Sequence, residues 1–369
     1  MGVRVAGIDP GTRSFDILGL EDDRVILDVS IPSEEVAARP GILIDVLRRA
    51  GPLDLIVGPS GYGIALKHIS EIDDKDIFLM TLVRPEESDI PVLVGLKRVV
   101  KELRKTDLNI YFIPGVVHLP TVPAYRKINA IDMGTADKLC CAALALYDYT
   151  TKRSLPLSEA SVILVEVGYG YNAVIAIDRG VVVDGVGGTR AGPGFLTSGG
   201  LDGEVAYLLG ALRKEMLFKG GVKTIAGGDI TPESLPEEAR VSGPARIAWY
   251  SFLEGVEKNV WSLVPVMSRV DAILLSGRLS RVEAICSELA KRLSRLAPVS
   301  RVGGFKAASK EAAQGAALIA NGLAGGFAEG LIEHMRIREA GGTVLDYVVV
   351  EDLKQIYLRE STTLKNKQL

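Results

Sequence analysis

The residues with the clearest chemical potential are two acids that each end an apolar run and precede a glycine-rich turn. Asp9 stands in the segment GIDPGTRS (Gly7–Ser14), and Glu166 stands in the segment VEVGYGYN (Val165–Asn172). Such turns expose backbone N–H groups and hydroxyls that suit terminal phosphates, and a carboxylate beside them can hold a hydrated Mg²⁺ ion. We therefore predict that Asp9 and Glu166 are metal ligands at a phosphate site.

A third segment, LLSGRLS (Leu274–Ser280), has the same form. Its Gly277 would let the backbone approach a ring or a phosphate beside the start of a helix. None of this is a P-loop, because the GxxxxGK[ST] pattern is absent and the first turn leads into a strand. The residues that we predict to contact a nucleotide at the three turns are Asp9, Gly11, Thr12, Arg13, Ser14, Gly168, Gly170, Asn172, Ser276, Gly277 and Arg278.

Arginines are the natural partners for the charge that develops in phosphoryl transfer, because a planar guanidinium can bind two oxygens at once. Arg190 lies in the glycine-rich segment GGTRAGPG and is our first choice. Arg126, in PAYRKINAIDMG, is the second. We predict that Arg190 and Arg126 are catalytic, the alternative for Arg126 being a solvated surface cation.

The elements that must position these residues occur twice. Each half begins with three strand-like segments joined by short turns, and two further apolar runs follow. The predicted strands of the two meanders are Val3–Ile8, Ser14–Leu20 and Val25–Val29 in the first half and Val162–Val167, Asn172–Ile177 and Val181–Asp184 in the second. This duplication predicts two facing α/β domains with a ligand cleft between them.

Helical segments complete each half. The small-residue segments Gly134–Leu146 and Lys310–Gly326 predict helices that can approach a neighbouring helix closely. The second half also carries an insertion, about residues 201–268, with apolar residues at helical spacing. We expect its aromatic stripe to belong to the core, and we expect disorder from Lys365 onward. The stripe comprises Trp249, Tyr250, Phe252 and Trp261.

Composition narrows the function classes. Lys and Arg number 43 against 46 Asp and Glu, so the basic surplus of a nucleic-acid binder is absent. The three cysteines, Cys140, Cys141 and Cys286, have neither metal-ligand spacing nor the even number of a disulfide framework. No apolar stretch approaches the roughly 18 residues of a membrane span, and the N-terminus lacks the apolar run of a signal peptide. We expect a soluble, cytoplasmic protein with neither nucleic-acid nor membrane partners.

The order and spacing of these segments resemble the superfamily of acetate kinase, sugar kinases, heat-shock chaperones and actin over essentially the whole chain. GIDPGTRS and VEVGYGYN resemble its two phosphate loops, and VDAILLSGRLS resembles its adenosine loop. GTADKLCCAA and EAAQGAALIANG are similar to its two connecting helices. Within the superfamily, the segment Val182–Gly200 most resembles the butyrate kinase branch of the short-chain carboxylate kinases.

This resemblance implies a duplicated ribonuclease H-like (actin-like ATPase) fold, with mixed sheets flanked by helices and a cleft between the domains. The expected domains are 1–155, 156–340 with the insertion, and a C-terminal extension over 341–369. Asp137, in GTADK, occupies the place of a catalytic or metal-organising acid of the superfamily. The resemblance also adds Gly303 and Gly304 to the nucleotide site and places the turn VGPSGYG beside the substrate, through Ser60, Gly61 and Tyr62. The carboxylate kinases carry an arginine in that turn, where this chain has Pro59 and Ser60.

The implied activity is an ATP- and Mg²⁺-dependent phosphotransferase that converts a butyrate-like short-chain carboxylate into an acyl phosphate. A small-molecule partner and a homo-oligomer follow from the same resemblance. A carboxylate nucleophile is ionised near pH 7 and needs no strong general base. Two alternatives remain open, namely an ATP-binding regulator of the same fold and a kinase for a hydroxyl group with Asp137 as general base.

Overall fold

Two mixed β-sheets form the frame of the molecule. The structure, a computed structural model, describes residues 2–84, 87 and 91–363. The strands of the first sheet are β1 (Arg4–Pro10), β2 (Ser14–Glu21), β3 (Arg24–Pro32), β4 (Leu55–Val57), β5 (Lys67–His68) and β6 (Ile110–Phe112). Those of the second are β7 (Val162–Val167), β8 (Asn172–Asp178), β9 (Val181–Val186), β10 (Ala272–Ser276) and β11 (Val299–Arg301).

The two sheets have the same topology. The strand order β3-β2-β1-β4-β6 of the first corresponds to β9-β8-β7-β10-β11 of the second, and β5 extends the first sheet at one edge. In each sheet the first three strands form an antiparallel meander, and the next two add in parallel. The predicted duplicated α/β fold is therefore confirmed. The predicted domain boundaries stay predictions.

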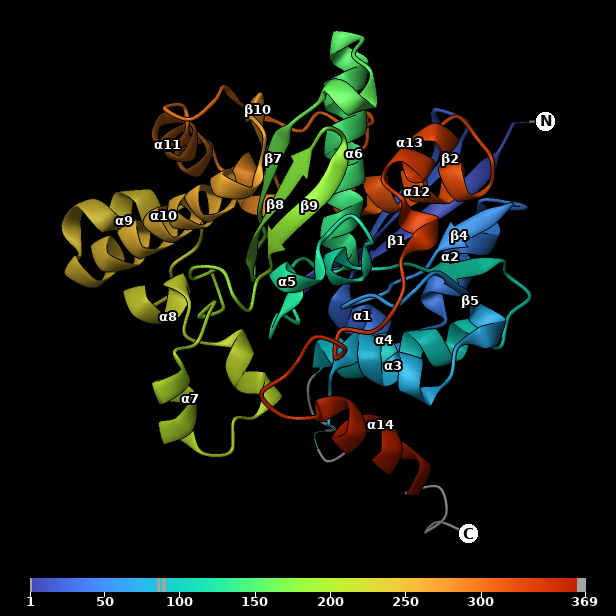
Figure 1. The fold of residues 1–369 in the computed structure, drawn as a ribbon, viewed down its shortest axis with the longest axis horizontal. Helices are drawn as coiled ribbons and strands as arrows, with labels where there is room; N and C mark the ends of the chain where they lie inside the picture. Colours follow the sequence, from blue (N-terminus) through green and yellow to red (C-terminus); the bar gives the residue numbers. More distant parts are fainter. Residues whose placement is uncertain (1, 85–86, 88–90, 364–369) are drawn as a thin grey trace.

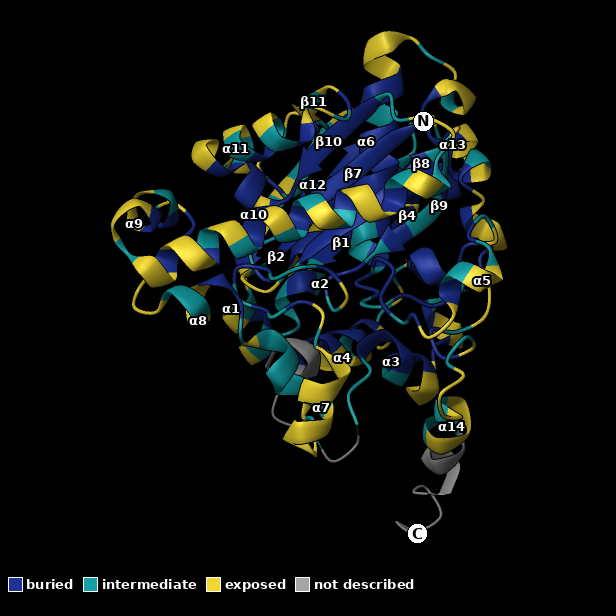
Figure 2. Ribbon diagram, turned by 60° about the vertical axis from the view of Figure 1, so that its left-hand side comes forward, coloured by how far each residue is buried: buried dark blue, intermediate teal, exposed yellow. Residues whose placement is uncertain are grey.

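The central strands carry apolar residues on both faces because helices cover both faces. All of Val5–Asp9 in β1 and all of β7 are buried, whereas the edge strand β3 is mostly half-buried or exposed. Figure 2 shows the sheets as buried ribbons behind helices whose outer faces are exposed.

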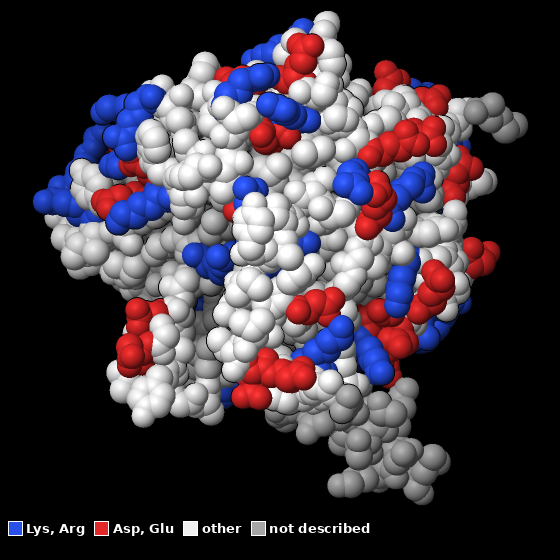
Figure 3. Space-filling view, in the orientation of Figure 1, with Lys and Arg blue, Asp and Glu red and all other residues white. Residues whose placement is uncertain are grey.

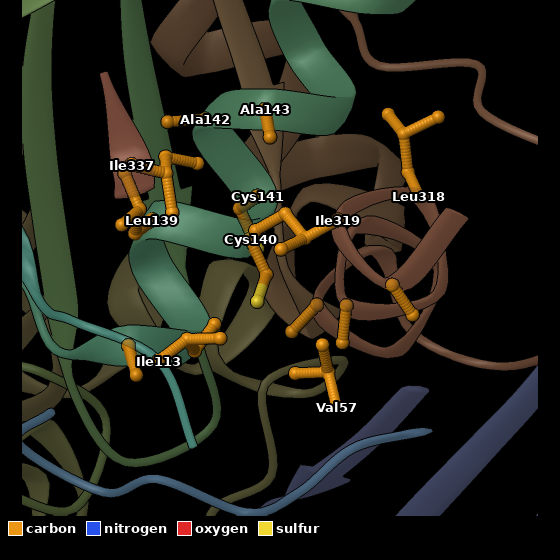
Figure 4. Packing of buried hydrophobic residues seen from close by; sticks show 14 of the residues in the cluster. Val57, Ile113, Leu139, Cys140, Cys141, Ala142, Ala143, Leu318, Ile319 and Ile337 are labelled. Atoms are coloured by element: carbon orange, nitrogen blue, oxygen red, sulfur yellow. The ribbon is translucent and has the colours of Figure 1, made fainter. Parts of the chain in front are cut away.

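Helices α6 (Ala136–Arg153) and α12 (Glu311–Leu323) pack against each other and join the two sheets. Helix α12 also contacts β1, β2 and β4, while α6 contacts β7 and β8. The close approach requires glycine at position 315, because a Cβ there would collide with the carbonyl group of Cys140. Figure 4 shows Cys140 and Ile319 between the two helices. Cys140 and Cys141 are buried in this interface and each is 3% exposed.

The insertion is helical, as predicted, but its aromatic residues are not all in the core. Its helices are α7 (Gly203–Leu209), the short 3₁₀ helix η4 (Lys214–Phe218), α8 (Val222–Ala226), α9 (Leu235–Val241) and α10 (Gly243–Leu263). Phe252 is buried, but Tyr250 is 51% and Trp261 is 38% exposed. These two rings stack with Arg292 and Arg295, at 5.8 and 5.2 Å, respectively. The expectation of a wholly buried stripe was wrong because an amphipathic helix buries only one face.

The remaining helices surround the frame (Figure 1). They are α1 (Ser33–Ala38), α2 (Ile42–Arg49), α3 (Asp74–Thr81), α4 (Pro91–Leu103), α5 (Ala124–Lys127), α11 (Glu283–Leu293), α13 (Glu329–His334) and α14 (Leu353–Thr363). The tail from Lys365, expected to be disordered, lies outside the described residues.

The visible surface in Figure 3 mixes basic and acidic side chains, with basic ones most frequent at the end built by α10 and α11. Over the described chain, no helix combines the length and apolarity that crossing a membrane requires.

Candidate functional site

The predicted phosphate turns meet in one pocket between the two sheets, with a cavity of about 220 Å³. The β1–β2 turn of the first sheet and the β7–β8 turn of the second both line this pocket. The predicted residues that line the pocket are Asp9, Gly11, Thr12, Arg13, Ser14, Ser60, Gly61, Tyr62, Asp137, Glu166, Gly168, Gly170, Gly277 and Arg278.

Four predicted nucleotide contacts do not line this pocket in the described structure: Asn172, Ser276, Gly303 and Gly304. Asn172 and Ser276 are buried at strand ends directly beside lining residues. The backbone N–H groups of Gly303 and Gly304 donate to the Asp148 carboxylate of α6, at 3.0 and 3.2 Å.

The two arginines predicted to be catalytic also lie outside the pocket lining. The guanidinium of Arg126 donates to the carbonyl oxygen of Val183 in β9, at 2.8 Å. The charges of Arg126 and Arg190 both act on Asp184, where they counteract part of the rise in pKa that burial causes. Arg126 therefore lies against β9, and Arg190 directly follows the pocket-lining residue Thr189. Their catalytic role stays a prediction.

Two lysines that the sequence analysis did not select hold the acids of the pocket. Lys310, the residue before α12, pairs with Asp9 at 2.6 Å and also donates to the Ser14 carbonyl oxygen at 3.1 Å. Lys138, in the first turn of α6, pairs with Asp137 at 2.6 Å and with Glu166 at 3.1 Å. Only the positions of these lysines in the sequence could have pointed to them, since Lys138 follows Asp137 and Lys310 stands at the start of the second small-residue segment.

Burial and these lysines set the ionisation of the acids. Burial raises the pKa of Glu166 to about 7, even though Lys138 lowers it in part. Burial also raises the pKa of Asp9 above its usual value, against the pull of Lys310. The pKa of Asp137 is lowered, because the charge of Lys138 and hydrogen bonds from Lys138 and Thr135 outweigh the effect of burial. Buried acids that outnumber their lysine partners provide a place for a further cation.

The residues present fit a Mg²⁺ ion bound together with a nucleotide. The described residues contain no cluster of three or more His, Cys, Asp or Glu side chains that could hold a metal ion without help. Mg²⁺ typically takes only one or two carboxylates and completes its shell with water and phosphate oxygens. Asp9 and Glu166, 4% and 6% exposed, line the pocket from the two hairpins and would supply those two carboxylates.

The third turn also suits a ligand. Gly277 has a φ of +86°, and a Cβ there would come within 2.6 Å of Glu166 Oε1. The neighbouring Ser276 hydroxyl is buried without a hydrogen-bond partner among the described residues. The guanidinium groups of Arg13 and Arg278 lie 4.3 and 5.6 Å from the centroid of the Tyr169 ring. Two cations beside one pocket suit the phosphates of a nucleotide.

Three residues of the turn predicted to lie beside the substrate, Ser60, Gly61 and Tyr62, line the pocket. The Ser60 hydroxyl accepts a hydrogen bond from the Ile113 N–H at 3.0 Å and donates one to the Gly58 carbonyl oxygen at 2.9 Å. The Gly61 carbonyl accepts from the N–H of Ala136, which fixes this turn to the start of α6. Ser60 therefore holds the turn in place with its hydroxyl, and the Tyr62 ring is left to face the pocket.

A family model described as "Protein of unknown function (DUF1464)" matches residues 7–350. No similar sequence is found among curated proteins.

Solved structures with the same fold include a propionate kinase from Francisella tularensis, with a TM-score of 0.62 and 14% identity over 85% of this chain and 98% of that one. Acetate kinase from Porphyromonas gingivalis gives a TM-score of 0.58 and 13% identity, with 85% and 98% of the two chains covered. Acetate kinase from Entamoeba histolytica gives a TM-score of 0.57 and 13% identity, with 79% of this chain and 87% of that one covered. At these identities the likeness shows the actin-like ATPase fold.

Proposed function

The chain belongs to the DUF1464 family, and we propose that it is an ATP- and Mg²⁺-dependent kinase that converts a short-chain carboxylate into an acyl phosphate. The observation that carries this proposal is the pocket where two duplicated hairpin turns bring Asp9 and Glu166 together with Lys138 and Lys310. Phosphoryl transfer depends mainly on positioning and on neutralising phosphate charge, and this set of groups suits both tasks.

The reaction needs no group that removes a proton. A carboxylate oxygen of the acceptor attacks the γ-phosphorus of ATP, the bond from that phosphorus to the bridging oxygen breaks, and ADP leaves with the electron pair. Asp9 and Glu166 would hold Mg²⁺, which neutralises charge on the phosphate oxygens when it is bound. Lys310, Lys138 and the backbone N–H groups of the glycine turns add fixed positive charge around the transferred group.

The state of Asp137 argues against Asp137 as the general base for a hydroxyl acceptor. A hydroxyl would need a general base, and the best base has a pKa close to the working pH. Asp137 has a lowered pKa, and its two carboxylate oxygens accept hydrogen bonds from Thr135 and Lys138. We assign Asp137 the role of positioning Lys138 against Glu166. The likeness of the fold to solved acetate and propionate kinases supports a carboxylate as the acceptor.

The test is ADP release from Mg·ATP with a panel of two- to five-carbon carboxylates, with hydroxylamine present to trap an acyl phosphate. We expect ADP and hydroxamate to form together, with a four-carbon acid as the first candidate. ADP release that depends on an alcohol or a sugar, without hydroxamate, would establish a hydroxyl acceptor instead. Nucleotide binding without turnover on any acceptor would favour the regulator.

A further inference from the structure

The segment around Lys214 crosses from the insertion to the N-terminal half beside the pocket. The N–H of Lys214 donates to Glu87 Oε1 at 2.9 Å, and the Arg84 guanidinium donates to the Leu212 carbonyl oxygen at 3.1 Å. On the other side, the Tyr171 hydroxyl donates to the Leu217 carbonyl oxygen at 3.1 Å. The 3₁₀ helix that begins at Lys214 is therefore fixed by both halves of the molecule.

The ammonium group of Lys214 lines the pocket and differs from the other two pocket lysines. Its Nζ donates to the Tyr62 hydroxyl oxygen at 3.1 Å and lies 4.7 Å from the centroid of the same ring. Among the described residues it forms no ion pair, whereas Lys138 and Lys310 are both paired with carboxylates. Burial lowers the pKa of Lys214 to about 8, against the opposing charges of Asp132 and Glu87. A half-buried cation without an ion-pair partner favours binding of an anion.

The acid in the pocket wall whose charge acts most strongly on Lys214 already has other partners. Asp132 accepts hydrogen bonds from the N–H of Gly134 at 3.2 Å and from the N–H and hydroxyl of Thr189 at 3.0 and 3.1 Å. These bonds hold the glycine-rich turn after β9 against the segment before α6. Asp132 therefore acts on Lys214 at longer range and does not neutralise it.

The groups beside Lys214 suit a small anion with an apolar tail. Met80, Phe218 and the ring of Tyr171 line the same pocket, and Phe218 packs edge-on against Tyr171 with 5.7 Å between ring centroids. The Ser60 hydroxyl, on the neighbouring turn, is taken up by backbone groups. An acceptor carboxylate in this pocket would have Lys214 as its cationic partner and these apolar side chains beside its hydrocarbon part.

We propose that Lys214 binds the carboxylate group of the acceptor and thereby makes the site select an anionic acceptor, an inference that rests on the proposed carboxylate kinase activity. Lys214 takes the place of the cation that the turn Pro59–Ser60 does not provide. The insertion then contributes directly to acceptor specificity.

The kinetic test compares Lys214→Met and Lys214→Arg with the wild type, using the best acid from the panel. Lys219→Met serves as the control, because Lys219 is exposed on the same segment. We expect Lys214→Met to raise KM for the acid at least about tenfold while KM for ATP stays within about twofold, and we expect Lys214→Arg to recover part of the loss. Suppose that the wild type is active and that the Lys214→Met variant is folded. An unchanged KM for the acid in the variant would then overturn the inference and leave the kinase proposal standing.

A second measurement does not require turnover. Acetic anhydride labels amines at mildly alkaline pH, and mass spectrometry measures labelling at Lys214 and Lys219 in the same wild-type sample. We expect the acid alone, without ATP, to slow labelling of Lys214 at least about threefold and to leave Lys219 unchanged, whereas the matching carboxamide protects neither lysine. Equal labelling of Lys214 with and without every acid of the panel would overturn the inference, whatever the enzyme assay shows.

Discussion

We predict that the buried His118 makes the protein less stable as the pH falls below 6.5. The residue is 3% exposed, its Nδ1 accepts a hydrogen bond from the N–H of Gly115 at 3.1 Å, and its Nε2 has no partner in the described structure. Val116, beside it, donates to the Gly134 carbonyl at the entrance to α6, which carries Asp137. Protonation of His118 would therefore weaken the contact between this segment and the start of α6.

The magnitude follows from the difference in pKa between the folded and unfolded chain. Burial lowers the pKa of His118 from 6.5 to about 4. The unfolded chain binds a proton at His118 below pH 6.5, whereas the folded chain does not bind it until about pH 4. The contribution of His118 to stability is therefore constant above pH 6.5 and falls below it. At 1.36 kcal/mol for each pH unit, the total loss is about 3 kcal/mol, of which about 2 kcal/mol has occurred at pH 5.

The assay is urea unfolding of the wild type and His118→Asn at pH 7.5 and pH 5.0. An asparagine side chain can still accept the Gly115 N–H, so we expect the variant to lose about 2 kcal/mol less stability than the wild type over this pH interval. His68→Asn is the control, because His68 also accepts a backbone N–H but is only half-buried. The chain has only 3 histidines, so their NMR titrations can be assigned by substitution. A His118 titration near pH 6.5, or identical pH dependence of the wild type and His118→Asn, would refute the reasoning.

Two further substitutions separate structural from chemical roles in the pocket. Asp137→Asn should lower kcat less than about tenfold and leave the shape of the pH profile unchanged, because a carboxyl with a lowered pKa is a poor base; a loss of about 10²–10⁴ would identify a general base and favour the hydroxyl acceptor. Ser60→Ala should reduce the free energy of unfolding by about 1–3 kcal/mol, since the buried Ile113 N–H loses its acceptor, while KM for the acid stays within about twofold. A large KM effect at unchanged stability would instead show that the Ser60 hydroxyl contacts the acceptor.

The fold and the phosphate turns could be predicted because their signals are local. The apolar runs that end at Asp9 and Glu166 and the turn glycines after them specify hairpins, and the repeat of that pattern specifies the duplication. The small residues of α6 and α12 similarly predicted close helix packing. The sequence could not show which residues meet, such as Gly315 and the Cys140 carbonyl, since these contacts join distant parts of the chain.

The charged residues of the site were harder to predict for the same reason. Lys310 reaches Asp9 only because α12 lies on the first sheet, and Lys214 reaches Tyr62 only because the insertion crosses to the N-terminal half. Arg126 and Arg190 were chosen for their chemistry and, for Arg190, its glycine-rich surroundings, yet neither is among the residues that line the pocket. Local pattern identifies the backbone of a ligand site better than it identifies the side chains that arrive from elsewhere.

The most direct test of the central claim is calorimetric titration of ADP into the wild type and Asp9→Asn, with Mg²⁺ and with EDTA. Asp23→Asn, an exposed acid on the turn after β2, is the matched control. We predict that Mg²⁺ strengthens binding to the wild type and to Asp23→Asn at least about tenfold and that Asp9→Asn loses this dependence, since one of two carboxylate ligands is gone. No binding of ADP to the wild type, or equal dependence on Mg²⁺ in Asp9→Asn, would contradict the assignment of this pocket as a Mg²⁺-nucleotide site.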